Sequence, residues 1–240
     1  MAGIYIHIPF CKQACHYCNF HFSTTLKKKN DMLEALQKEI VLRKQELSDE
    51  VLETIYFGGG TPSILSLDEI QKLIDTVYEN YSVISNPEIT LEANPDDLSG
   101  NVIVQLSKSP INRLSIGIQS FFESDLKLMN RAHSAEEAKK CLSIATKYFE
   151  NISVDLIYGI PNVTNEQWLV NVKTALSYNI PHISSYALTV EPKTALASFI
   201  SKGIIDDVDD KKAQEQFYLL LDALDEADFI HYELSNFGRD

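Results

Sequence analysis

Six short segments rich in Ile, Val, Tyr and Phe recur along the chain, and stretches with a helical spacing of apolar residues separate them. This alternation requires parallel strands joined by right-handed crossovers, which build either a doubly wound sheet or a barrel. Six successive units favour a barrel. The sequence therefore predicts an α/β fold, a partial (β/α)6 TIM-like barrel, with strands at residues 4–9, 54–58, 88–94, 113–120, 152–159 and 182–190.

Three of the predicted helices begin with a capping box, in which a Ser or Thr and the Glu or Gln three residues later bond each other's backbone N–H groups. The pairs are Ser66 and Glu69, Ser134 and Glu137, and Thr164 and Gln167. The last predicted helix, 211–229, is followed by residues 230–237, which resemble the start of another strand. We therefore expect 1–229 to form the core domain and 230–240 to begin a C-terminal region that is truncated here.

The composition favours one domain that binds neither nucleic acid nor a membrane. Hydrophobic residues make up 45% of the 240, enough for a substantial core in an undivided domain. The 21 basic and 34 acidic residues give a net charge of −13, the wrong sign for binding a phosphate backbone. The first apolar segment is far shorter than the roughly 20 residues of a membrane span, so we expect no signal peptide, no transmembrane segment and a cytoplasmic location.

Cys11, Cys15 and Cys18 lie within eight residues and offer three thiolates to one inorganic centre. A 4Fe-4S cluster held by three thiolates keeps one iron open for another ligand, whereas an electron carrier normally closes all four. Cys141, the fourth cysteine, lies on the apolar face of a predicted helix and is expected to be a core residue. A disulfide framework is disfavoured, and zinc held by the three thiolates and His21 remains an alternative.

Polar or conformationally permissive residues lie at the end of each predicted strand. Ligands bind at the carboxyl ends of strands in parallel α/β folds, so we expect a site there. Besides the cysteine segment, these residues lie at 58–62, 92–95, 119–120, 155–159 and 185–187. The triple glycine at 58–60 precedes no Gly-Lys-Ser/Thr and is not a P-loop. Its open backbone could hydrogen-bond the amino group of a small zwitterion.

These motifs together resemble the radical S-adenosylmethionine (SAM) superfamily. Within it, they are similar to the group that contains oxygen-independent coproporphyrinogen III oxidase and a related heme chaperone. The matching segments are the CxxxCxxC run at 11–18, YIHIPFC at 5–11, YFGGGTP at 56–62, EANP at 92–95, SIGIQS at 115–120, NRAH at 130–133 and DLIYGIP at 155–161. The resemblance spans essentially the whole chain and implies a partial barrel of the radical SAM type.

The resemblance also implies roles for individual residues. In the superfamily three cysteines hold a 4Fe-4S cluster, and S-adenosylmethionine chelates its open iron. The implied cluster ligands are Cys11, Cys15 and Cys18. The implied S-adenosylmethionine contacts are Gly59, Gly60 and Thr61 for the methionyl amine, Glu92 for the ribose or amine, Gln119, Arg131 and Asp155 for the ribose and carboxylate, and Tyr5, Tyr17 and Ala187 near the cluster and adenine. The structural alternative makes Arg131 and Asp155 a buried ion pair and Glu92 a satisfied strand-end carboxylate.

Two departures from the oxidase pattern favour the chaperone. The oxidase continues Cys-x-Cys after its third ligand, whereas this chain has Cys18, Asn19 and Phe20. The oxidase also has an extension before its first strand, and here that strand begins almost at once. The expected function is therefore that of a heme chaperone with a 4Fe-4S cluster and S-adenosylmethionine, which transfers heme to acceptor proteins. The alternative is the porphyrin-forming oxidase, and the oligomeric state stays open.

Overall fold

The structure is a computed structural model that describes residues 2–239. Six parallel strands follow one another both in sequence and in space, and an antiparallel hairpin then pairs with the sixth strand. The sheet order is β1-β2-β3-β4-β5-β6-β8-β7, with β1 at one edge and β7 at the other, so the barrel is open. The strands are β1 (Ala2–Ile8), β2 (Leu52–Gly59), β3 (Val83–Ala93), β4 (Arg113–Gln119), β5 (Asn151–Tyr158), β6 (His182–Ala187), β7 (Ile230–Glu233) and β8 (Asn236–Gly238).

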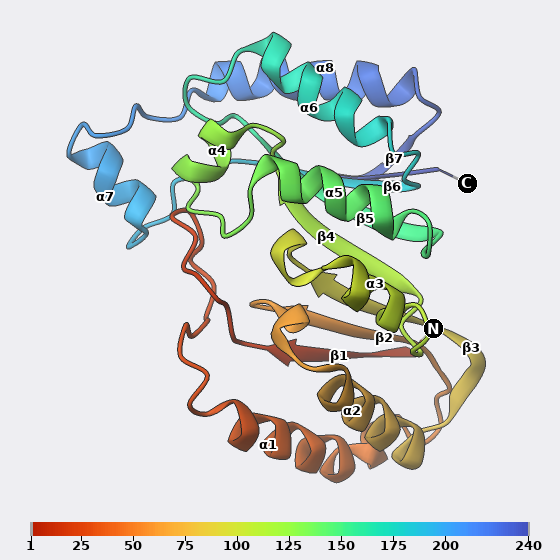
Figure 1. Cartoon of the computed structure of the whole chain (residues 1–240). Coiled ribbons are helices and arrows are strands. Elements are labelled where there is room, and N and C mark those ends of the chain that lie inside the picture. Colours follow the sequence, from red (N-terminus) through yellow and green to blue (C-terminus); the bar gives the residue numbers. More distant parts are fainter. Residues whose placement is uncertain (1, 240) are drawn as a thin grey trace.

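The helices lie along one face of this sheet, and Figure 1 shows α7 standing apart from the others. They are α1 (Lys29–Leu42), α2 (Leu67–Asn80), α3 (Gly100–Leu106), α4 (Glu123–Leu128), α5 (Ala135–Ala145), α6 (Asn165–Leu176), α7 (Ala195–Ser201) and α8 (Asp210–Asp225). Short 3-10 turns occur at Lys44–Leu47, Pro62–Ile64 and Pro95–Asp97. Among residues 2–239, none of these helices combines the length and the apolar character needed to cross a membrane.

The predicted α/β class, the six parallel strands and the three capping boxes are confirmed. Several predicted boundaries differ from the observed ones. The last helix ends at Asp225 and not at Phe229, because Asp228 has φ = 60° and the N–H of Phe229 bonds back to the carbonyl of Leu224. The predicted strand at 230–237 is a hairpin, because the chain turns between Glu233 and Asn236.

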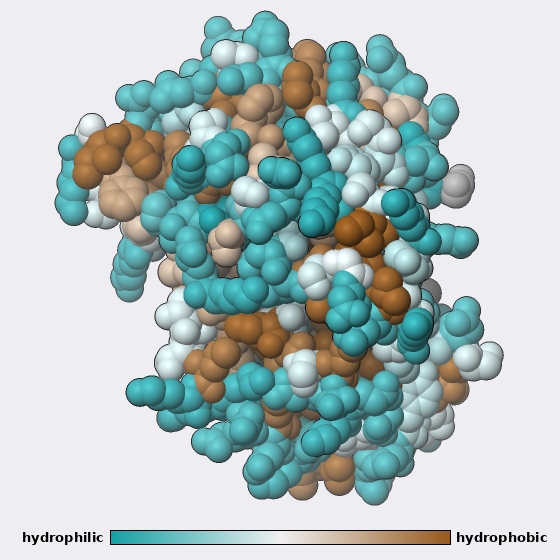
Figure 2. Space-filling view, in the orientation of Figure 1, coloured by the Kyte–Doolittle hydropathy of each residue, from teal (hydrophilic) through white to brown (hydrophobic). Residues whose placement is uncertain are grey.

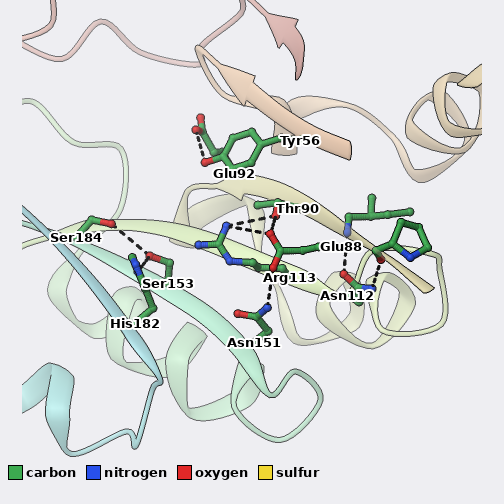
Figure 3. Close-up of polar contacts among 12 residues, drawn as sticks. Tyr56, Glu88, Thr90, Glu92, Asn112, Arg113, Asn151, Ser153, His182 and Ser184 are labelled. Carbon is green, nitrogen blue, oxygen red and sulfur yellow. Dashed lines mark hydrogen bonds and ion pairs between the residues drawn. The ribbon is translucent and has the colours of Figure 1, made fainter. Parts of the chain in front are cut away.

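The two faces of the sheet have opposite chemistry. On the helix side, alternate strand residues such as Ile89, Leu114 and Val154 are buried in the hydrophobic core. The residues between them point to the other face, which we call the inner face. Figure 3 shows several inner-face side chains, which are Tyr56, Glu88, Thr90, Glu92, Arg113, Asn151, Ser153, His182 and Ser184. A closed TIM barrel fills this space with bulky aliphatic side chains, so the polar inner face indicates a place for a ligand.

The surface on the helix side is mostly hydrophilic. In the view of Figure 2, apolar side chains gather at α7 and in the hollow near the middle of the molecule. The hydrophilic surface follows from the amphipathic helices, which turn their apolar side to the sheet; α2, for example, buries Ile70, Leu73, Ile74 and Val77.

Candidate cofactor site

A cavity of about 690 Å³ opens at the carboxyl ends of the parallel strands. Twelve of the thirteen site residues that the sequence singled out line it, and only Tyr5 does not. The lining set is Cys11, Cys15, Tyr17, Cys18, Gly59, Gly60, Thr61, Glu92, Gln119, Arg131, Asp155 and Ala187. Residues from β2 to β6 and from the loop after β1 therefore meet at one place, as the parallel topology requires.

Residues 11–18, which we call the cysteine loop, form no helix or strand and are held in place by tertiary hydrogen bonds. Asn130 contributes the most. Its side-chain N–H donates to the carbonyl of Ala14 at 2.7 Å, and its side-chain oxygen accepts from Gln13 at 2.7 Å. The backbone N–H of His16 donates to Met129. Asn130 adopts φ = 56°, a left-handed conformation that Asn tolerates better than most residues, so the segment after α4 fixes the loop.

The glycine turn after β2 brings the backbone close to the cysteine loop. A Cβ atom on Gly60 would lie 2.7 Å from the carbonyl oxygen of Phe10 and 3.0 Å from the Sγ of Cys11. Gly59 has φ = 119°, which L side chains rarely adopt. Burial raises the pKa of the Cys11 thiol, and a hydrogen bond with the Thr61 side chain opposes that rise. Only glycines allow the turn to pack against the first cysteine in this way.

Arg131 connects the cysteine loop to β3 and β4. One terminal nitrogen donates to Asn94 Oδ1 at 2.5 Å and to the carbonyl of Gly117 at 2.9 Å, while the other lies 3.4 Å from Cys15 Sγ. Its donors thus bind neutral oxygens and a thiol and not Asp155, so the alternative of a buried ion pair is wrong. The Nε atom of Arg131 is buried without a hydrogen-bond partner. A ligand acceptor in the cavity would satisfy it.

Glu92 is held at the wall of the cavity by two donors. The hydroxyl of Tyr56 donates to one carboxylate oxygen at 2.8 Å, and the N–H of Gly59 donates to the other at 3.2 Å. Burial raises the pKa of Glu92, and these hydrogen bonds oppose the rise. Tyr5 lies outside the cavity and stacks on Tyr56, with 5.8 Å between ring centroids. Tyr5 therefore acts on the site through the ring that orients Glu92.

Asp155 is the second carboxylate of the cavity. Burial raises its pKa to about 7, and the nearby charge of Glu92 adds to the rise, while Arg131, a hydrogen bond with Ser184 and Arg113 oppose it. The pair can accept hydrogen bonds from hydroxyl or ammonium groups of a ligand. A cationic ligand would favour the ionised form of both carboxylates.

Three neighbours of the site were not among the predicted residues. Tyr56 orients Glu92, Asn94 accepts from the Arg131 guanidinium and donates to Thr61, and Ser184 opposes the rise in the pKa of Asp155. Asn94 and Tyr56 lie inside the quoted motifs. A signal for two of them exists in the sequence, because polar and apolar residues alternate around Tyr56 on β2 and Ser184 on β6, and that alternation marks the inner face.

The three cysteines of the loop line the cavity together. Within residues 2–239, no three His, Cys, Asp or Glu side chains are grouped so as to hold a single ion, and His21 does not line the cavity. Cys11, Cys15 and Cys18 are free, partly exposed thiols that line the cavity. Cys141 is 2% exposed, in the core beside α5 residues such as Leu142, as predicted. The three thiols that line the cavity and the unpartnered Nε of Arg131 fit a three-thiolate cluster with a bound ligand.

The sequence profile of the radical SAM superfamily matches residues 5–175. The chain belongs to the radical SAM superfamily. Two relatives are the proteins called heme chaperone HemW from Lactococcus lactis, 34% identical over 98% of this chain, and from Bacillus subtilis, 34% identical over 100% of it. A third is radical S-adenosyl methionine domain-containing protein 1, mitochondrial, of Bos taurus, 34% identical over 99% of this chain.

A solved structure gives the same radical SAM fold. Coproporphyrinogen III oxidase (HemN) from Escherichia coli, described as a radical SAM enzyme, aligns with a TM-score of 0.86 and 27% identity over 98% of this chain. The chain spans only part of each of these proteins: 61% and 64% of the two bacterial HemW proteins, 54% of the bovine protein and 55% of the oxidase. The radical SAM fold predicted from the motifs is therefore confirmed.

Proposed function

We propose that this radical SAM protein is a heme chaperone whose core domain is residues 1–229. In this proposal Cys11, Cys15 and Cys18 hold a 4Fe-4S cluster, S-adenosylmethionine occupies the cavity beside it, and heme is carried to acceptor proteins. The observation that carries the cofactor part is the cavity that is lined by the three thiols together with Glu92, Arg131 and Asp155. The heme part is supported by the names of the two bacterial relatives.

In this proposal, different residues of the cavity bind different parts of S-adenosylmethionine. The Glu92 carboxylate accepts from the amine or ribose, and Gly59 and Gly60 line the cavity where the methionyl group would lie. Arg131 provides a buried donor for the carboxylate. When bound, the cluster and S-adenosylmethionine together supply reductive cleavage of a carbon–sulfur bond.

Gln119 holds its place in the cavity at the cost of backbone strain. It is 8% exposed and has φ = 67°, an unusual conformation for a residue other than glycine. Strained residues of this kind concentrate at functional sites, where the surrounding structure maintains them. This strain supports a ligand-contacting role for Gln119, which lies at the end of β4 and lines the cavity.

Phe20 favours the carrier over the oxidase. It occupies the position at which the oxidase pattern has an additional cysteine, and its side chain is 72% exposed while lining the cavity. An exposed aromatic ring offers a flat apolar ligand a surface but no thiol chemistry. The oxidase remains the second candidate, because the alignment with the Escherichia coli oxidase covers 98% of this chain.

One experiment separates the two functions. The protein is reconstituted anaerobically with iron and sulfide and titrated with ferric heme by absorbance. It is then given coproporphyrinogen III, S-adenosylmethionine and a reductant. We expect stoichiometric heme binding and no protoporphyrinogen. Product formed over repeated turnovers would contradict the carrier function and would show that the thiol absent at position 20 is dispensable for the oxidase reaction.

A further inference from the structure

The side-chain amide of Asn94, directly after β3, lies between two residues that contact the cysteine loop. Its Oδ1 atom accepts from Nη2 of Arg131 at 2.5 Å, and its Nδ2 atom donates to the Thr61 hydroxyl at 3.3 Å. The other terminal nitrogen of Arg131, Nη1, donates to Cys15 Sγ at 3.4 Å, and the Thr61 side chain hydrogen-bonds Cys11. Asn94 therefore joins the donors of two cysteines.

The guanidinium at one end of this network fixes the direction of each hydrogen bond. Arg131 can only donate, so the atom of Asn94 that faces it is the amide oxygen, and the amide nitrogen faces Thr61. The Thr61 oxygen accepts from that N–H, which leaves its single hydroxyl proton to be donated to Cys11. Thiolates at Cys11 and Cys15 thus each receive a donor, the O–H of Thr61 and an N–H of Arg131.

Further contacts hold Asn94 and Arg131 in these positions. The backbone N–H of Asn94 donates to the Ser63 hydroxyl at 3.3 Å, and Nη2 of Arg131 donates to the Gly117 carbonyl at 2.9 Å. A Cβ atom on Gly117 would lie 3.2 Å from Arg131 Nη2 and 3.4 Å from Asn94 Oδ1, so this glycine leaves room for the pair. Thr61 is buried, and Thr61, Asn94 and Arg131 all line the cofactor cavity. The network is therefore part of the cavity wall beside the cysteines.

Cys18 differs from the other two cysteines because its donor comes from the backbone. The N–H of Phe20 hydrogen-bonds its thiol. Hydrogen bonds to the sulfurs are among the factors that set the reduction potential of an iron–sulfur cluster, because a donor stabilises the more negative, reduced cluster. A side chain that orients the donors of Cys11 and Cys15 can therefore shift this potential without touching the iron.

We infer that Asn94 is a positioning residue that raises the reduction potential of the cluster by directing the Thr61 hydroxyl to Cys11 and the Arg131 guanidinium to Cys15. The inference rests on the cluster of the proposed function and is independent of the heme part. On reduction the cluster takes up one electron from an external reductant, and no bond to Asn94, Thr61 or Arg131 forms or breaks. Asn94 thus decides how strong a reductant the cluster requires.

The test is a reductive titration of the anaerobically reconstituted protein with titanium(III) citrate, in which electron paramagnetic resonance measures the reduced cluster at each potential. S-adenosylmethionine is left out, so loss of a contact with it cannot contribute. We expect Asn94→Ala and Thr61→Val each to lower the ratio of reduced to oxidised cluster at a given potential about tenfold, because each weakens a hydrogen bond to a thiolate. For one electron, a tenfold change is a shift of about 59 mV to lower potential.

Two control variants should keep the wild-type potential. Thr61→Ser retains the hydroxyl that Thr61→Val removes. Asn80→Ala removes an amide that donates to the Thr76 carbonyl within α2. A double variant then checks that Asn94 acts through Thr61: Asn94→Ala combined with Thr61→Val should lower the ratio by less than the roughly hundredfold of two independent losses. A full hundredfold effect would contradict the positioning role.

The outcomes separate this inference from the function on which it rests. If the wild-type protein takes up no iron–sulfur cluster, the cofactor assignment fails and the inference fails with it. If the wild type holds the cluster and both Asn94→Ala and Thr61→Val have its potential, the inference alone is overturned. If Asn94→Ala takes up no cluster, the two Thr61 variants decide. Equal potentials in them overturn the inference, and a lower potential in Thr61→Val supports it, because a merely structural contact changes the cluster content and not the potential.

Discussion

Cys15 differs from the other two cysteines of the loop in its contact with a buried guanidinium, at 3.4 Å from Arg131. We predict that Cys15→Ser, examined after anaerobic reconstitution, loses most of the bound iron and of the cluster absorption, because a serine hydroxyl is a poor ligand for the iron of such a cluster. Cys141→Ala is the matched control, since Cys141 lies buried at α5 and outside the cavity. Full retention of iron and absorption in Cys15→Ser would refute the cluster assignment.

Asp155 makes stability depend on pH in a direction that can be worked out. Its folded pKa of about 7 lies above the ordinary value of 3.8, so between these values the folded protein binds more protons than the unfolded one. The contribution of Asp155 to stability is complete below pH about 4 and is lost as the pH rises through about 7. Asp155→Asn cannot ionise and avoids this loss.

We therefore predict that Asp155→Asn gains stability relative to the wild type as the pH rises from 4 to 8, by at most about 4 kcal/mol. Urea unfolding of both cluster-free proteins at several pH values measures the difference. His133, whose pKa burial lowers to about 4, titrates in both proteins and cancels from the comparison. A difference between variant and wild type that stays constant with pH would show that Asp155 is already ionised in the folded protein at acid pH.

At the scale of the elements, the glycine turn after β2 is the most sensitive contact with the cysteine loop. Gly60→Ala would place a methyl group 2.7 Å from the Phe10 carbonyl oxygen, and backbone atoms cannot move aside as a flexible side chain can. We expect a loss of about 1 to 3 kcal/mol in stability and of most of the cluster iron, with the far-ultraviolet circular dichroism retained.

Gly100→Ala is the control for that substitution. Its added methyl group would meet only the end of the Ile144 side chain, at 3.3 Å, which can shift. Gly100→Ala should therefore keep its iron. Equal iron contents in the two variants would mean that the turn does not shape the cysteine loop.

The sequence predicts the elements well where the signal is local. Apolar residues on the helix side of each strand identified the six parallel strands, and Ser134 with Glu137 marked the start of α5 as observed. A strand was predicted at 230–237, but its division into β7 and β8 was missed because the β7 residues are all exposed and show no buried alternation. Its position depends on pairing between β8 and β6, and that contact is distant in the sequence.

The candidate site was also predicted only in part. Motifs located the residues that line the cavity, since they lie at strand ends that the parallel topology brings together. The supporting bonds could not be predicted, because they depend on side-chain directions across strands. Asn130, which fixes the cysteine loop, lies more than a hundred residues from it in the sequence.

At the scale of the whole molecule, the sheet is continuous, but the pairing between β3 and β4 in its centre is short. We call this pairing the joint. The β3 and β4 strands pair through four residues each, fewer than the other parallel neighbours. Asn112, labelled in Figure 3, strengthens this pairing: its side chain donates to the Pro87 carbonyl and accepts from the Ile89 N–H, both at 2.8 Å. One hydrophobic core contains residues from both sides of this joint, from β1 to β3 on one side and from β4 to β8 on the other.

This continuity predicts that the chain unfolds as one unit. Trp168, the sole tryptophan, is fully buried on α6 and donates to the Gln216 carbonyl, so its fluorescence reports on the half that contains α6 and α8. Circular dichroism reports on all helices. We expect the two signals to change at the same urea concentration, and Asn112→Ala to lower both midpoints together by the equivalent of about 1 to 3 kcal/mol, because it leaves two backbone groups unpaired. A fluorescence transition that precedes the circular dichroism transition would show that the joint between β3 and β4 separates two independently folding halves.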